Sequence, residues 1–210
     1  MPNKPSKSKI VHEPVQARSR ERVERILAAA RKVLERDGLE GFSSTAIARE
    51  AGVPVGSFYQ FFPNREAILV LFYEEYLGFI RAEIEAFETP ENIALSWQEF
   101  AAAFVAHMRR QEFTTPYILQ LYLAIEREPS LRELEQQQME LVADFIVRHM
   151  KRYGVRKDEA SLRRAGMFLY EFNNALWSFA TRAGEEYFDD EALRWQTKTA
   201  LSVLGELFED

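Results

Sequence analysis

The amino-acid sequence predicts an all-α fold of about nine helices. Apolar residues recur every three to four positions through most of the 210 residues, and no stretch sustains the apolar-polar alternation of a half-buried strand. Residues that favour helix caps, together with Gly and Pro, separate these apolar stripes. A chain of this length with 47% hydrophobic residues can bury a substantial core.

The first three predicted helices are joined by short turns. The first has one apolar stripe and ends at Asp37-Gly38, because glycine readily adopts the left-handed backbone conformation that follows a helix. Ser43 or Ser44 can cap a second helix at 45–51, which Gly52 and the proline after it end. A third short helix is predicted at 55–61. The stripe of the first helix consists of Val23, Ile26, Leu27, Ala30, Val33 and Leu34.

Longer helices are predicted for the rest of the chain. Asn64 is placed to cap one that reaches Phe87, Thr89-Pro90 has the cap and first-turn proline of another, and Ser130 to Glu133 has capping-box spacing. These signals give a division into a disordered basic arm (1–15), a head (16–65) and a helical body (66–210). The later helices are expected at 90–110, 115–127, 130–153, 158–183 and 189–208.

Charge is distributed unevenly along the chain. The net charge is −6, but residues 1–65 carry 12 Lys and Arg against 7 Asp and Glu, whereas residues 66–210 carry 15 against 26. A basic head can approach phosphate groups while the acidic body is repelled from them. A basic tail without any partner would give the same asymmetry.

Several classes of function are disfavoured by the sequence. It has no cysteine, and its three histidines, His12, His107 and His149, are too far apart in sequence to suggest a metal site, so no metal or other cofactor is expected. A glycine-rich phosphate loop and a nucleophile elbow are both missing, which leaves an enzyme, such as a hydrolase or transferase on a helical scaffold, as a remote alternative. Without a signal peptide or an apolar span, we expect a cytoplasmic protein with no membrane contact.

Residues 45–61 have the layout of a helix-turn-helix, in which the second short helix enters the major groove of DNA. An apolar seam can pack against the first helix, and it comprises Ile47, Ala48, Ala51, Val53, Phe58 and Phe62. This leaves a small, polar set to face outward: Val55, Gly56, Ser57, Tyr59 and Gln60. Glycine permits close approach to DNA, tyrosine can bind phosphate, and glutamine can read adenine. A helical hairpin that binds no DNA has the same pattern.

Residues 44–68, STAIAREAGVPVGSFYQFFPNREAI, resemble the signature of the tetracycline-repressor (TetR) family over about twenty-five positions without a gap. The resemblance includes the Ala-Gly-Val turn and the Gly-x-hydrophobic-Tyr pattern of the recognition helix. There are two departures. Arg65 stands where the family usually has lysine, and arginine also binds phosphate. Phe61 stands where histidine or tyrosine is common, and phenylalanine forms no hydrogen bond.

The resemblance implies a homodimeric transcriptional regulator, most often a repressor, that a small hydrophobic or aromatic effector releases from a palindromic operator. On this interpretation Ser44 and Tyr59 contact phosphates, and Arg65 clamps another with the amide end of the following helix. Further contacts with the DNA backbone are expected from Arg18, Arg20 and Arg22. The residues expected to face bases are Thr45, Val55, Gly56, Ser57 and Gln60. The alternative is a helical dimer that binds ligands or proteins but no specific DNA.

The carboxy-terminal sequence independently permits a dimer. Helix 158–183 has apolar residues on two faces, one with Leu162, Gly166, Leu169, Leu176 and Ala180 and another with Ala165, Phe168, Phe172 and Phe179. A monomeric bundle is the alternative. Candidate effector-binding residues are aromatic, or polar within apolar stripes: Phe72, Phe100, Phe104, His107, Tyr117, Phe145, Phe172, Asn173 and Trp177. Aromatic stripes are more often core than ligand contacts, and His107 and Asn173 could equally have protein partners.

Overall fold

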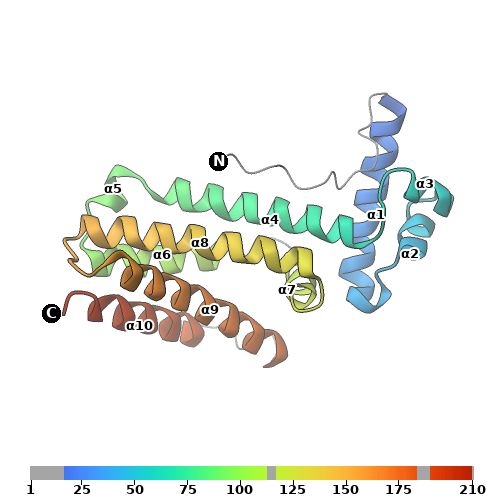
Figure 1. Ribbon diagram of the computed structural model, residues 1–210. Coiled ribbons are helices and arrows are strands. Elements are labelled where there is room, and N and C mark those ends of the chain that lie inside the picture. Colours follow the sequence, from blue (N-terminus) through green and yellow to red (C-terminus); the bar gives the residue numbers. More distant parts are fainter. Residues whose placement is uncertain (1–16, 113–116, 184–189, 210) are drawn as a thin grey trace. The chain divides into compact units, whose positions relative to one another are not determined.

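The computed structural model describes residues 17–112, 117–183 and 190–209, and within these ranges it contains helices and no strand (Figure 1). The all-α prediction is therefore confirmed. The predicted arm at 1–15 lies outside the described residues. The helices are α1 (Ala17–Gly41), α2 (Ser44–Glu50), α3 (Val55–Tyr59), α4 (Glu66–Phe87), α5 (Pro90–Ile93), α6 (Trp97–Glu112), α7 (Ile118–Ile125), α8 (Pro129–Arg152), α9 (Glu159–Ala183) and α10 (Asp190–Glu206).

The described ranges hold one helix more than the nine predicted, because the segment expected as a single helix at 90–110 contains two. The side chain of Thr89 caps α5, as predicted, by accepting a hydrogen bond from Asn92 N–H at 3.3 Å. Ser96 then starts α6 with a capping box. Its hydroxyl accepts from Glu99 N–H at 3.3 Å, and Glu99 Oε2 accepts from Ser96 N–H at 3.1 Å. The Ser-Trp-Gln-Glu sequence carries this signal.

Other helix starts follow the predicted chemistry, with one exception. Ser43 caps α2 by accepting from Ala46 N–H at 3.1 Å, and Asn64 caps α4 by accepting from Ala67 N–H at 2.9 Å. The prediction that Ser130 caps α8 is wrong, because this helix already begins at Pro129. Proline suits the first turn of a helix, where its missing N–H would have no partner.

The first helix breaks at Gly38, where the sequence predicted that it ends. The φ of 63° and ψ of −169° at Gly38 lie outside the helical region, and a short second helical segment, included in the bounds of α1, follows up to Gly41. Gly52, with φ of 64°, makes the turn after α2. An L side chain would be strained at both positions.

The chain forms two compact units. The first contains α1 to α3, α4 as far as Tyr76, and α7 with its flanking residues up to Arg132, while the second contains the remainder. α7 therefore packs with the amino-terminal helices although it comes from the middle of the sequence. Both α4 and α8 continue from one unit into the other. The functional domain boundaries at 15 and 65 stay predictions.

Each unit has its own apolar core. In the first, Ile26, Leu34, Phe42, Ile47 and Ile68 are fully buried. In the second, a glycine allows two helices to approach closely, since a Cβ atom built on Gly166 of α9 would lie 2.8 Å from Ala143 Cα of α8. None of the helices described is both long enough and apolar enough to cross a membrane.

Candidate nucleic-acid interface

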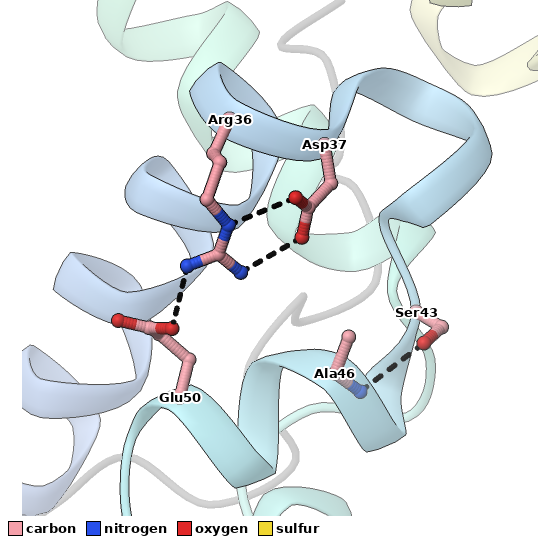
Figure 2. A network of polar contacts seen from close by, with 5 residues as sticks. All are labelled: Arg36, Asp37, Ser43, Ala46 and Glu50. Atoms are coloured by element: carbon pink, nitrogen blue, oxygen red, sulfur yellow. Dashed lines mark hydrogen bonds and ion pairs between the residues drawn. The ribbon is translucent and has the colours of Figure 1, made fainter.

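An arginine of α1 fixes the position of α2 in the first unit. Figure 2 shows Arg36 between two carboxylates: it donates two hydrogen bonds of 2.8 Å to Asp37 and one of 3.0 Å to Glu50 of α2. The guanidinium holds the pKa of the Asp37 carboxyl below its ordinary value. All three side chains are partly exposed, so the network orients α2 more than it stabilises the fold.

A second arginine of α1 fixes the turn between α2 and α3. Arg25 Nη2 donates to the carbonyl oxygen of Ala51 at 2.8 Å and lies 3.4 Å from that of Gly52. These carbonyl groups follow the end of α2, where the helix supplies no partner for them. Arg25 and Arg36 both belong to α1, and both bind the carboxy-terminal end of α2, so α1 holds this end of the helix and the turn that leads to α3.

The predicted apolar seam forms the core beneath α2 and α3. Ile47, Ala48, Ala51, Phe58 and Phe62 are buried, as predicted, and the rings of Phe58 and Phe62 lie 5.6 Å apart. Val53 is half-buried.

Phe61, one of the two departures from the family pattern, is also buried, with 7% of its surface exposed. An apolar ring suits that position, since it adds to the core without leaving a polar group unpaired.

The outer face of α3 is open. Val55 is 37% exposed and Tyr59 is 50% exposed, Gly56 and Gln60 are exposed, and Ser57 is half-buried. A Cβ atom built on Gly56 would meet no atom of the described residues within 4 Å. On α2, Thr45 is exposed and Ser44 is half-buried. The residues of α2 and α3 that are predicted to contact DNA are therefore all at least partly accessible to a partner outside the unit.

Arg65 has protein partners that the sequence did not suggest. Its Nη1 donates to the carbonyl oxygen of Phe42 at 2.6 Å and to that of Leu39 at 3.3 Å, and its Nε donates to Glu66 at 2.9 Å. The two carbonyls follow the break at Gly38, and the carbonyl of Leu39 also accepts a hydrogen bond from Phe42 N–H at 3.3 Å. Arg65 therefore ties α4 to the α1–α2 connection, and its role as a phosphate clamp stays a prediction.

Two of the predicted effector residues, Phe72 and Tyr117, meet each other in the first unit. Their ring centroids are 5.4 Å apart, and Arg31 lies over the Phe72 ring at 4.8 Å while its Nε donates to the Tyr117 hydroxyl at 3.4 Å. Nearby, Leu39 N–H donates to Gln120 Oε1 at 3.1 Å. These contacts join α7 to α1 and α4.

Four other predicted effector residues gather in the second unit. They form one cluster of packed rings, which we call the ring cluster. Its members are Phe87 of α4, Phe100, Phe104 and His107 of α6, and Phe145 and His149 of α8. His107 Nε2 lies 3.0 Å from Glu83 Oε2, so a protonated imidazole would form an ion pair with this carboxylate.

The remaining predicted effector residues lie on α9. The ring of Phe172 stacks on Phe168 with centroids 6.4 Å apart, and Asn173 accepts a hydrogen bond from Gln196 of α10. The side chain of Trp177 lies outside those that the structure describes. The sequence therefore grouped residues that the fold distributes over two units and several helices.

His149 was not among the predicted site residues, yet it is the most buried titratable group of the second unit's ring cluster. Its side chain is 3% exposed, and its Nε2 lies 2.7 Å from Glu88 Oε1. Burial lowers the pKa of the imidazole below its ordinary value, while Glu88 acts in the opposite direction. Its position eleven residues after Gln138 on the buried face of α8 is the signal that could have indicated it.

Among the residues described, no three His, Asp or Glu side chains gather in a way that could hold a metal ion. Neither unit therefore presents a candidate metal centre within the described ranges. The open face of α3 remains the feature of the first unit that most clearly requires a partner.

Comparison with known proteins agrees with this geometry. Residues 26–71 match the family model described as "Bacterial regulatory proteins, tetR family". This segment contains most of α1, all of α2 and α3 and the start of α4. A search among curated proteins gave no match.

Solved structures with the same fold extend the similarity to most of the chain. A TetR-family transcriptional regulator from Streptomyces coelicolor is 15% identical, with a TM-score of 0.66 over 90% of this chain and 97% of its own. The multidrug binding protein EbrR in complex with imidazole is 20% identical, with a TM-score of 0.65 over 91% and 97%. The fatty acid degradation regulator FadR from Bacillus halodurans is 17% identical, with a TM-score of 0.64 over 88% and 95%.

The TM-scores of these structures show a shared fold, and the family model matches the segment that carries α2 and α3. Residues 26–71 therefore carry the sequence pattern of the bacterial tetR family of regulatory proteins, and the chain has the fold of solved TetR-family transcriptional regulators.

Proposed function

We propose that this protein is a cytoplasmic, homodimeric transcriptional repressor that a small hydrophobic or aromatic effector releases from a palindromic DNA operator. The observation that carries the proposal is the open face of α3, which lies within the family segment and has Gly56 at its centre with unoccupied space beside it. An exposed helix face with a glycine and no apolar cover is suited to the close approach of a DNA groove.

The proposed contacts divide into two kinds. Ser44 and Tyr59 bind phosphates and so position the protein on DNA. The excess of basic residues in 1–65 adds attraction that does not depend on sequence. Base edges are read by Thr45, Val55, Gly56, Ser57 and Gln60.

Large apolar side chains on α9 and α10 support the proposed dimer. Phe168 is 53% exposed, Phe179 is 44% exposed and Trp195 is 48% exposed. Exposed aromatic residues on neighbouring helices are typical of surfaces that a partner covers. Two-fold pairing would present two copies of α3 to the two halves of a palindrome and raise affinity through their linkage.

The proposed response to effector uses α4, which continues from the first unit into the second. A ligand that favours a different position of this helix would change the spacing of the two recognition helices and lower operator affinity. The solved protein EbrR, described as a multidrug binding protein, holds imidazole in one structure and malachite green in another. A small aromatic effector for this chain is in keeping with those ligands.

The test of DNA binding is Gly56→Ala. The new methyl group meets no atom of the described protein, and alanine favours a helix by about 1 kcal/mol over glycine, so we expect the variant to fold at least as stably. If DNA approaches this backbone, the methyl group collides with it and affinity falls by at least tenfold. The measurement is fluorescence anisotropy with a DNA fragment that the wild-type protein selects from a random pool.

Gly78→Ala is the matched control. Gly78 is exposed on α4 and also has open space where a Cβ atom would lie, so this variant makes the same change away from α3. Its affinity for DNA is expected to equal that of the wild type. Undiminished binding by Gly56→Ala would exclude α3 as the recognition helix, and a wild-type protein that selects no DNA would favour the alternative, a dimeric ligand-binding or protein-interaction module.

Sequence specificity is tested separately with Gln60→Ala. A glutamine that reads a base contributes about 1–3 kcal/mol of discrimination, and this contribution is lost on the selected fragment but not on random DNA. The variant is compared with the wild type on both DNAs at the same salt concentration. Equal losses of affinity for the selected fragment and for random DNA would mean that Gln60 binds the DNA backbone and does not read a base.

A further inference from the structure

A glutamine lies buried in the second unit without a partner. The side chain of Gln138 on α8 is 2% exposed, and neither its Nε2 nor its Oε1 has a hydrogen-bond partner among the residues that the structure describes. The two glutamines before it, Gln136 and Gln137, are exposed. An amide group buried without a hydrogen bond costs free energy of folding, so such groups are rare and point to a partner of another kind.

The position of Gln138 on its helix relates it to the ring cluster of the second unit. Phe145 and His149 follow it by seven and eleven residues, which is two and three turns on the same face of α8. All three side chains are buried. Gln138 therefore continues the buried face that the aromatic residues form.

Ring contacts between α6 and α8 indicate which part of α6 lies opposite Gln138. Phe104 packs on Phe145 with ring centroids 4.7 Å apart, and Phe100 packs on His149 with centroids 4.5 Å apart. Because the residue numbers rise along α6 as they fall along α8, the two helices are antiparallel. The same register, continued by two turns, brings Gln138 level with the last turn of α6, so its amide lies at one end of the ring cluster.

We propose that Gln138 is the polar anchor of the effector site, and that the effector is a neutral molecule with a flat apolar body and a group that both donates and accepts hydrogen bonds, such as a carboxamide or a lactam. This inference rests on the proposed function, because it gives the chemical class of the effector. An amide ligand would satisfy both Nε2 and Oε1 of Gln138. A carboxylate would satisfy only the nitrogen and would lose its hydration as well.

The spacing sets the size of the ligand. Seven residues of helix separate Gln138 from Phe145 by about 10 Å along the axis. A body of two fused rings with one carboxamide spans most of this distance once the length of the glutamine side chain is included. Such a body would pack against Phe104 and Phe145, whose rings already stack on each other.

A binding role and a structural role of Gln138 have opposite effects on stability. If the amide serves only a ligand, its replacement by leucine removes an unpaired polar group from the interior, and the free protein becomes more stable. If the amide instead binds a buried water molecule or contributes a structural hydrogen bond, the same change destabilises the protein. The melting temperature of the free protein therefore distinguishes the two.

The experiment uses the full chain without DNA and the probe 2-naphthamide. We expect Gln138→Leu to raise the melting temperature of the free protein by about 2–4 °C. We expect 2-naphthamide to bind the wild type and raise its melting temperature, and to bind Gln138→Leu at least tenfold more weakly in calorimetric titration. Gln138→Met, which keeps the length of the side chain, is a second variant with the same expected loss of binding.

Two controls isolate the amide. Gln137→Leu makes the same change on the exposed side of α8 and should leave probe binding unchanged. The probe 2-naphthoate keeps the rings but carries a charge, and it should bind the wild type at least tenfold more weakly than 2-naphthamide.

Three results would overturn the inference: a lower melting temperature of both Gln138 variants, equal binding of 2-naphthamide to the wild type and Gln138→Leu, or no binding of 2-naphthamide to the wild type. Because DNA is absent, each of these leaves the Gly56→Ala test of the proposed function unaffected, and a failure of DNA binding leaves this measurement unaffected.

Discussion

At the scale of single residues, Arg65 has a structural role in the protein and a proposed second role on DNA. Its guanidinium donates to the carbonyl groups of Leu39 and Phe42, in the connection between α1 and α2. We predict that Arg65→Ala lowers the free energy of unfolding by about 1–2 kcal/mol, because charge-assisted hydrogen bonds are lost from a partly exposed site. Chemical denaturation with urea measures this loss.

The second role of Arg65, the phosphate clamp, is tested by the salt dependence of DNA binding. Loss of one phosphate contact reduces the slope of log affinity against log salt by about one. Arg18→Ala is the control for stability alone: this arginine is exposed near the start of α1 and its loss should leave unfolding unchanged, whereas its expected contact with the DNA backbone would lower the salt slope. An Arg65→Ala variant with the stability of the wild type would contradict the structural role, and one with an unchanged slope would remove Arg65 from the clamp.

At the scale of helices, the crossing of α8 and α9 depends on the absence of a side chain at Gly166. We predict that Gly166→Ala lowers the free energy of unfolding, because its methyl group would lie 2.8 Å from Ala143 Cα and overpacking costs about 1–3 kcal/mol. This exceeds the gain in helix propensity of about 1 kcal/mol. Gly78→Ala, at an open position of α4, should instead raise the free energy of unfolding. Equal stabilisation of both variants in urea denaturation would show that α8 and α9 can separate at little cost.

At the scale of the whole molecule, dimerisation through α9 and α10 is the proposal with the largest consequence for DNA binding. Leu204 of α10 is only 3% exposed, so a charge at this position would disturb the core and would not test an interface. Phe168 and Trp195 are about half exposed and are the better probes. We predict that Phe168→Glu and Trp195→Glu give folded monomers in light scattering, with operator affinity lowered at least tenfold.

Leu123→Glu is the control for the dimer experiment, since Leu123 is an apolar residue of α7 that is 42% exposed in the first unit. This variant should keep both the mass and the operator affinity of the wild type. Folded variants of Phe168 and Trp195 that stay dimeric would mean that the interface lies elsewhere. Monomers that bind the operator with wild-type affinity would disprove the need for pairing.

The sequence by itself determined the helical class and most helix boundaries, because these depend on local chemistry. Ser43, Asn64 and Thr89 act as the caps that their types and positions predict, since a cap involves atoms only three residues apart. The sequence also identified the α2–α3 segment as a helix-turn-helix. Its buried seam follows directly from the spacing of apolar residues along two short helices.

Only the tertiary structure decided which distant residues meet. It put α7 in the first unit, where Gln120 accepts a hydrogen bond from Leu39 N–H, and it gave Arg65 two carbonyl partners on the α1–α2 connection. It also showed that Gln138 is buried and unpaired, whereas Gln137 beside it is exposed. No local pattern separates two adjacent glutamines in this way, because burial is set by which helices pack together, and that depends on contacts across the whole chain.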